Sequence, residues 1–197
     1  MEYLDICDEN GMPTGRVTGR TEAHAKGIRH RTAHVWVVRQ LRDKYQVLLQ
    51  KRSSCKDSFP GKYDTSSAGH IPAGDEPLAS ALRELEEELG IRACPDTLRF
   101  AGRFSVSVSN VFHGVPFRDN EVRNVYVYSE PVMIEDLVLQ EDEVDEAIWF
   151  DLEKLCKLVG NNDDRFCVPP ESLDILLGFL SKAELNVHPD PTPTSPD

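Results

Sequence analysis

The segment from Asp75 to Gly90 constrains this chain more than any other, because it combines a helix pattern with a dense group of acids. Asp75 is predicted as the N-cap, Pro77 lies in the first turn, and Gly90 is predicted as the C-cap. Apolar side chains recur at three- and four-residue steps, which predicts one apolar stripe. These side chains are Leu78, Ala81, Leu82, Leu85 and Leu89.

Three of the acids on this predicted helix share one face. Glu84, Glu87 and Glu88 follow the spacing i, i+3 and i+4, so their side chains project together within one turn. Like charges at this spacing destabilise a bare helix, and a hard divalent cation such as Mg²⁺ or Mn²⁺ would offset the repulsion. Arg83 precedes Glu87 by four residues and could orient its carboxylate. Taken alone, the three acids fit a solvated helix face better than a metal site.

The residues on either side of the acids favour a metal site over a solvated helix face. The stretch from Gly69 to Ile91 resembles the Nudix box, G-x5-E-x7-R-E-U-x-E-E-x-G-U with U apolar, and only Asp75 departs, standing where the pattern has Glu. The resemblance implies an α/β fold: an α/β/α sandwich around a mixed β-sheet, with a loop-helix-loop catalytic motif. The matching positions are Gly69, Arg83, Glu84, Leu85, Glu87, Glu88, Gly90 and Ile91.

The resemblance also implies a reaction. Nudix proteins use Mg²⁺ or Mn²⁺ and activated water to cleave the diphosphate linkage of a small nucleoside or other organic diphosphate. The implied metal ligands are Glu84, Glu87 and Glu88, with the carbonyl of Gly69, and Arg83 would orient them. Either Glu88 or a glutamate outside the box would act as the general base. Glu121 is the outside candidate, against the alternative of an ordinary solvated loop acid.

Four motifs outside the box resemble the isopentenyl diphosphate isomerase branch of the Nudix superfamily. They lie at residues 27–36, 48–52, 59–61 and 66–70, within a likeness that spans about residues 2–155. The isomerases carry a cysteine where this chain has Ala68. Because that thiol is missing, we expect hydrolysis rather than isomerisation. Isomerase-like activity on prenyl diphosphates stays an alternative, and a non-catalytic, ligand-sensing Nudix domain is an alternative of another class.

Histidines and basic residues supply further site candidates. His24, His30 and His70 match the metal-binding histidines of the isomerase branch, and a metal or phosphate role is weighed evenly against a role in loops or caps. His34, Trp36 and Trp149 are predicted to be core residues. Guanidinium and ammonium groups suit phosphate oxygens, although an exposed strand edge explains them equally well. The substrate-binding candidates are Arg29, Arg31, Lys51, Arg52 and His70, with Lys56 from the same basic stretch.

The charge of the chain limits its partners. The 197 residues hold 22 basic and 34 acidic side chains, a net charge of −12, which argues against a general nucleic-acid binder. Residues 16–62 carry +9 and could receive a polyanion, whereas residues 130–153 carry −10 with no role predicted beyond solubility. The expected partner is a small organic diphosphate, and a homodimer is possible.

The five cysteines lack the spacing of a metal site, and no apolar run is long enough for a membrane span. We therefore expect a cytoplasmic protein with reduced thiols. We expect one Nudix domain over residues 1–183 and a disordered tail over 184–197. Loops are expected at residues 8–15, 53–62 and 109–121. Strands are predicted at residues 3–7, 34–38, 45–50, 63–71, 98–108, 122–129 and 147–150, and further helices after caps at Asp151 and Ser172.

Overall fold

The predicted amphipathic helix is confirmed as α2 (Pro77–Leu89) in the computed structural model, which describes residues 2–112 and 114–182. The helix ends at Gly90, whose φ of 72° places it in the left-handed region that glycine tolerates best. The prediction of Asp75 as the N-cap is wrong. Asp75 belongs to the preceding turn, where its N–H bonds to the Pro72 carbonyl, and Glu76 is the N-cap residue, without a side-chain capping bond.

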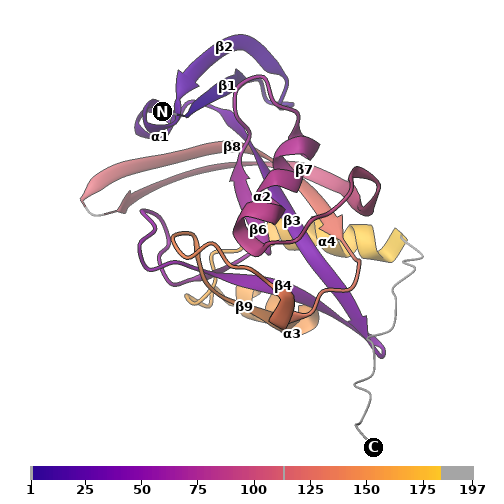
Figure 1. Ribbon diagram of the computed structural model, residues 1–197. Coiled ribbons are helices and arrows are strands. Elements are labelled where there is room, and N and C mark those ends of the chain that lie inside the picture. Colours follow the sequence, from indigo (N-terminus) through magenta and orange to yellow (C-terminus); the bar gives the residue numbers. More distant parts are fainter. Residues whose placement is uncertain (1, 113, 183–197) are drawn as a thin grey trace, which may run out of the picture.

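A mixed sheet of seven strands forms the centre of the molecule (Figure 1). Its longest buried strand is β3 (His30–Leu41), which pairs in parallel with β8 and antiparallel with β4 and β6. β7 adds to β8, and both β5 and β9 pair with β4. The other six strands are β4 (Lys44–Arg52), β5 (Tyr63–Asp64), β6 (Ser67–His70), β7 (Leu98–Phe112), β8 (Val115–Tyr128) and β9 (Val144–Asp151).

Helices cover both faces of this sheet, which confirms the α/β/α sandwich. On β3, alternate side chains divide between two cores: Val35 packs with the α2 residues, and Trp36 packs with α3 (Leu152–Gly160) and α4 (Pro170–Lys182). Trp36 is therefore a core residue, as predicted. Its Nε1 donates to Ser172 Oγ at 3.0 Å, so Ser172 lies inside α4 and the prediction that it caps this helix is wrong. The cap at Asp151 is confirmed by a bond from the Lys154 N–H.

The N-terminal region forms a small layer of its own above the sheet in Figure 1. β1 (Tyr3–Cys7) agrees with the prediction, and it pairs with β2 (Pro13–Gly19), which begins inside the expected loop over residues 8–15. The short helix α1 (Arg20–Lys26) follows and was not predicted. Two 3₁₀ turns, η1 (Pro95–Thr97) and η2 (Ile134–Asp136), complete the described elements.

The loop predicted over residues 109–121 lies instead within the outer part of a long hairpin. β7 and β8 stay paired from Leu98 and Tyr128 out to Phe112 and Val115. We call its outer part, residues 105–112 and 115–122, the arm, which extends from the body in Figure 1. The hairpin places Glu121 on a strand directly beside His30. The predicted tail over residues 184–197 lies outside the described residues.

Candidate functional site

The Glu88 carboxylate is the most deeply buried acid of the box. The residue is 4% exposed, and its Oε2 accepts hydrogen bonds from Gln50 Nε2 and from the Ala68 N–H, both at 3.1 Å. Burial, together with the nearby charge of Glu84, raises the pKa of Glu88 to about 8. A carboxylate buried beside another acid is stabilised most by a cation, so this position fits a metal ligand.

The other box residues lie next to Glu88 on α2 and contact Gly69 and Arg83. The Glu84 carboxylate lies so close to Gly69 that a Cβ at position 69 would overlap it, which explains why the box requires glycine there. Burial raises the pKa of Glu84, and the Arg83 guanidinium opposes this shift. Arg83 contacts Glu84 at 2.7 Å and the half-exposed Glu87 at 2.8 Å, and it also donates to the His70 carbonyl at 3.3 Å. Arg83 thus orients two of the three predicted ligands.

Gln50 is a site residue that the sequence analysis missed. It lies on β4 and is 2% exposed, on the strand face that also buries Leu48 against α2. The available signal was a polar residue at a position where strand alternation requires an apolar one. Its Nε2 donates to Glu88 Oε2 at 3.1 Å and so helps to fix the direction of that carboxylate.

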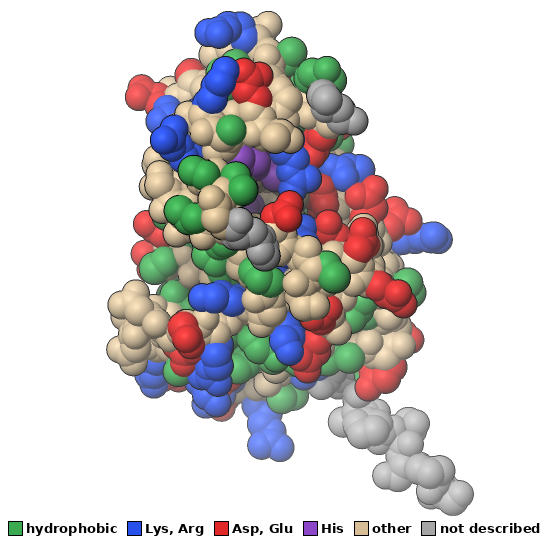
Figure 2. Space-filling view, turned by 90° about the vertical axis from the view of Figure 1, so that its left-hand side faces the viewer, with side chains coloured by type: hydrophobic (Ala, Val, Ile, Leu, Met, Phe, Trp, Pro, Cys, Tyr) green, Lys and Arg blue, Asp and Glu red, His purple; other side chains and the backbone are tan. Residues whose placement is uncertain are grey.

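Three predicted histidines meet in a second group, although they come from α1, β3 and β6. The ligand atoms of His24, His30 and His70 all lie within 4.8 Å of one another, and His24 Nε2 is 3.0 Å from His70 Nε2. Asp119 and Glu121 form an overlapping group with His30. We call these five residues the histidine centre. Figure 2 shows histidine surface within a recess on the side toward which the arm points.

Several polar atoms of the histidine centre are buried without a hydrogen-bond partner in the described structure: His24 Nδ1, His30 Nε2 and Asp119 Oδ1. Such atoms carry a desolvation cost unless a ligand satisfies them. Burial lowers the pKa of His24 to about 4 and that of His70 well below its usual range, so both imidazoles are neutral at pH 7. Neutral imidazoles combined with carboxylates are a donor set for a divalent metal ion.

Glu121 is the central charge of this group. Its Oε1 lies 3.6 Å from His30 Nε2 and 4.0 Å from His70 Nε2, and Arg123 Nε donates to Oε2 at 2.7 Å. Burial is the largest single influence and opposes ionisation, but the Arg123 guanidinium together with His30 and His70 outweighs it and holds the pKa of Glu121 well below its usual range. Glu121 is therefore an ionised strand residue, 5% exposed, rather than the solvated loop acid of the alternative interpretation.

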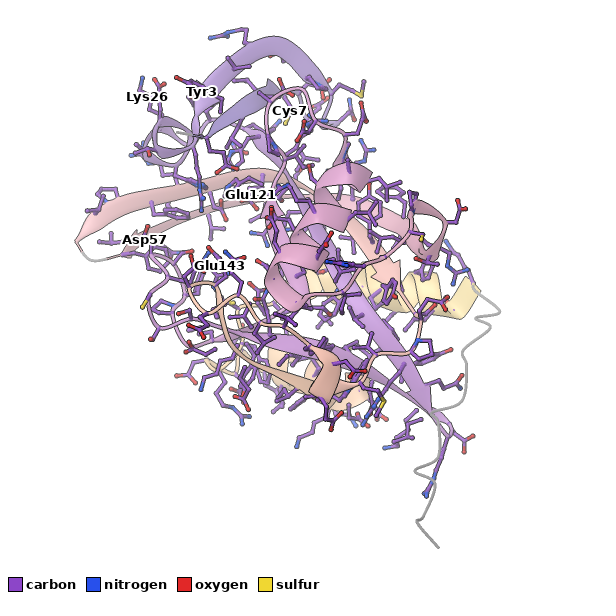
Figure 3. All side chains as sticks on the ribbon, viewed as in Figure 1. Tyr3, Cys7, Lys26, Asp57, Glu121 and Glu143 are labelled. Carbon is purple, nitrogen blue, oxygen red and sulfur yellow. The ribbon has the colours of Figure 1, made fainter. Side chains whose placement is uncertain are left out.

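The box acids and the histidine centre are adjacent because β6 connects them. Gly69 contacts Glu84 on one side, and the next residue, His70, contributes its ring to the histidine centre. In Figure 3, Glu121 lies above Glu143, which belongs to the segment before β9 and pairs with Lys56. The box acids and the histidine centre therefore lie next to each other across β6.

Most of the predicted phosphate-binding cations already have partners. Arg31 is buried, donates to Asp5 Oδ2 at 2.9 Å and to the Asp75 carbonyl at 3.1 Å, and so connects β1 to the loop before α2. Arg52 pairs with Asp64 at 3.3 Å, and Arg29 donates to Asn120 at 3.2 Å. Lys51 lies half-buried on β4 opposite Tyr63. Substrate binding by these residues stays a prediction.

Two predicted core residues differ in their surroundings. His34 is buried beside Thr32, whose Oγ1 is 3.2 Å from His34 Nε2, and this confirms a core position. Trp149 is only half-buried, and the Arg39 guanidinium lies 4.2 Å from the centroid of its ring. Trp149 therefore borders the α2 core rather than filling it.

A mixed sheet between helices, with a carboxylate helix beside a histidine centre, defines an α/β protein with candidate metal ligands, and comparison with known proteins identifies the family. The NUDIX domain model matches residues 29–168. The chain is 39% identical to an uncharacterized Nudix hydrolase of Clostridium acetobutylicum over 83% of this chain and 76% of that protein. It is 38% identical to Nudix hydrolase 3 of Arabidopsis thaliana over 84% of this chain, but over only 21% of that longer protein.

The chain belongs to the Nudix family and is a hydrolase of the acid-anhydride class. A crystal structure of a Deinococcus radiodurans protein shares the fold, with a TM-score of 0.66 and 16% identity over 90% of this chain and 99% of that one. The NUDIX domain of Shewanella oneidensis NrtR, solved with ADP ribose, has a TM-score of 0.54 and 14% identity over 84% of this chain and 99% of that one. At these identities the two structures support the fold alone. Within the described residues, no helix is both long and apolar enough to cross a membrane.

Proposed function

We propose that this protein hydrolyses the diphosphate linkage of a small organic diphosphate with the help of Mg²⁺ or Mn²⁺. The observation that carries the proposal is the buried Glu88 carboxylate, held by Gln50 and Ala68 beside Glu84. The ion would be held by Glu84, Glu87 and Glu88, with the Gly69 carbonyl as a further ligand. When bound, it neutralises charge on the diphosphate oxygens and makes a water molecule more acidic.

The remaining residues act as positioning groups and as a base. Arg83 holds the carboxylates of Glu84 and Glu87 in place, and Gln50 orients the carboxylate of Glu88. Both Glu88 and Glu121 are candidates for the base that accepts the proton of the attacking water. Glu121 has Arg123 against one oxygen and His30 near the other, so it is the less available of the two. We therefore favour Glu88.

The histidine centre supports a second, overlapping proposal. Its geometry fits a divalent cation, and its three histidines are those that link the chain to the isomerase branch. This favours an organic diphosphate of either the nucleoside or the prenyl type. We propose hydrolysis for both types, because Ala68 lies opposite His34 where the isomerases have a thiol. Interconversion of prenyl diphosphate isomers would replace this proposal by isomerisation. Tight ligand binding without hydrolysis under any divalent metal ion would replace it by ligand sensing.

Further features of the proposal concern the whole chain. We propose one domain over residues 1–183, with residues 184–197 as a tail outside it. A cytoplasmic location follows from the five cysteines, which are all unpaired, and a homodimer is compatible with the fold. The expected ligand is a small molecule, since a net charge of −12 disfavours general nucleic-acid binding.

The deciding experiment measures phosphate or monophosphate release from nucleoside diphosphates, nucleotide sugars, dinucleotides and prenyl diphosphates, with and without Mg²⁺ or Mn²⁺. We expect Glu87→Gln and Glu88→Gln to reduce metal-dependent turnover by about 100-fold or more, a loss typical of removing a charge-stabilising group. The matched control is Glu86→Gln, on the same helix but paired with Arg92. Unchanged turnover in both site variants would eliminate the proposed metal site.

A further inference from the structure

A pocket of about 370 Å³ lies beside the histidine centre, and nothing in the proposed chemistry uses it. It is bounded by the inner face of the arm, by the loop over residues 53–62, and by the segment that leads into α4. Two phenylalanine rings and two valines supply apolar walls, and polar side chains line the rest of the pocket. The lining residues that matter here are Phe59, Val106, Ser107, Phe117, Asp119 and Arg123.

The pocket and the histidine centre are continuous. Asp119 lines the pocket, and its Oδ1 lies 3.6 Å from His24 Nδ1. Phe117 also lines the pocket, and its ring stacks on His24 with centroids 4.4 Å apart and an interplanar angle of 15°. One small molecule can therefore place a charged end at the metal-binding groups and another part in the pocket.

Phe59, which lines the pocket, is held in an unusual backbone conformation. Its φ is 50°, in the left-handed region, which costs a bulky residue about 1 kcal/mol or more and is concentrated at functional sites. Its ring meets Phe112 edge to face at 5.1 Å, and Phe112 in turn meets Phe117 at 5.5 Å. These ring contacts join the loop over residues 53–62 to the arm, whereas a loop without a partner would leave its aromatic side chain exposed.

The charges around the pocket exclude phosphate as its occupant. Arg123 is the only lysine, arginine or histidine among the described lining residues. Its guanidinium is already paired, with Asp119 at 3.1 Å and with Glu121 at 2.7 Å. The pocket therefore offers apolar surface, hydroxyl groups, the Asn110 amide and the carboxylates of Asp119 and Glu171, but no unpaired cation.

We propose that this pocket binds an uncharged, largely apolar organic group of the diphosphate substrate, and that Phe59 determines specificity for that group. The inference rests on the proposed diphosphate hydrolysis and adds a substrate class to it: diphosphates whose organic part carries no further phosphate. Rings and alkyl groups gain free energy by leaving water for this pocket, whereas a second phosphate would be left without a counter-charge.

The test compares benzyl diphosphate with methyl diphosphate under Mg²⁺. The wild-type protein should prefer the benzyl compound in kcat/KM by about tenfold or more. In Phe59→Gly the ring is lost while glycine accepts the left-handed backbone, so the variant keeps its fold. We expect this variant to lose most of the preference through KM for the benzyl compound, with methyl diphosphate hydrolysed as before. Phe100→Ala, which removes an exposed ring of β7 outside the pocket, is the control.

Equal use of the two compounds by the wild-type protein, or an unchanged preference in Phe59→Gly, would overturn the inference. Hydrolysis of neither compound with any divalent ion would instead count against the proposed function. The pocket would then be tested by calorimetry with benzyl phosphate. Binding about tenfold weaker in Phe59→Gly than in the wild-type protein supports the pocket, and equal binding refutes it.

Discussion

Gln50 shows how a single uncharged residue sets the geometry of the site. Its amide donates to Glu88 Oε2, and replacement by methionine would keep the volume but remove the donor. A hydrogen bond to a charged group contributes about 1.5 kcal/mol or more, so we predict that Gln50→Met raises the Mg²⁺ concentration for half-maximal activity about tenfold. A metal titration of hydrolysis at fixed substrate measures this shift.

A matched control for this prediction lies on the same strand. Gln46 accepts from Arg39 at 2.8 Å, away from the box acids, and Gln46→Met should leave the metal titration unchanged. If both variants required the same Mg²⁺ concentration as the wild-type protein, Glu88 would be oriented by its backbone contact alone.

His34 predicts how stability depends on pH. Burial lowers its pKa to about 4, whereas the unfolded chain has a value near 6.5. Between these values the unfolded state binds more protons, so stability falls as the pH falls. We expect His34 to account for about 2 kcal/mol of the stability lost between pH 7 and pH 5. Urea unfolding of the chelated protein should show a smaller loss in His34→Gln, and an equal loss would contradict this assignment.

The sequence could predict site residues only where they are close together along the chain. Glu84, Glu87 and Glu88 lie within one helical turn, so their common face follows from helix geometry. Gln50 acts on Glu88 across 38 positions, and Asp119 joins the histidine centre only because β8 runs beside β3. Contacts of this kind depend on sheet pairing, which no local pattern encodes.

At the level of elements, the buried pair of Asp5 and Arg31 connects β1, β3 and the loop before α2. Asp5 Oδ2 accepts from Arg31 at 2.9 Å and from the Gly74 N–H at 2.9 Å. Removing one partner of a buried pair leaves an uncompensated charge, so we predict that Asp5→Leu lowers the free energy of unfolding by about 3 kcal/mol. Because Gly74 precedes the box helix, kcat should fall as well. Urea unfolding and steady-state kinetics measure the two effects.

A nearby exposed pair provides the comparison for Asp5. Glu2 and Arg20 are 3.2 Å apart, with exposed fractions of 31% and 49% for their side chains. Glu2→Gln should change the free energy of unfolding by less than about 1 kcal/mol. In a double-mutant cycle, adding Arg31→Met to Asp5→Leu should recover part of the loss; full additivity would show that the two side chains are not coupled.

Elements differ in how well the sequence predicts them, and burial is the reason. The box helix was predicted because one stripe is buried, which produces a clear period in the sequence. The arm was predicted as a loop because its strands pair mainly with each other and expose both faces, so polar residues such as Ser109 and Asn120 carry no alternation. β2 was missed for the same reason, since five of its seven residues are exposed.

For the whole molecule, fewer basic side chains are available to a ligand than the sequence indicates. The basic stretch over residues 16–62 carries +9, yet many of its side chains pair with acids or amides elsewhere in the fold. The cationic surface expected for a polyanion is therefore largely neutralised within the structure. Under the proposed function, attraction of a diphosphate to the site then depends on the metal ion rather than on the net field of the protein.

The proposed binding of a metal ion leads to a prediction for the stability of the whole protein. A ligand that binds only the folded state at 100 times its Kd adds about 2.7 kcal/mol, which for a chain of this size raises Tm by about 5–10 °C. We expect Mg²⁺ to produce such a rise in the wild-type protein and in His24→Gln, but not in the double variant Glu87→Gln, Glu88→Gln. Calorimetric scans with Mg²⁺ and with chelator measure it. A full rise in the double variant would move the magnesium site from the box to the histidine centre, because within the described residues those five side chains bring potential ligand atoms together beside β6.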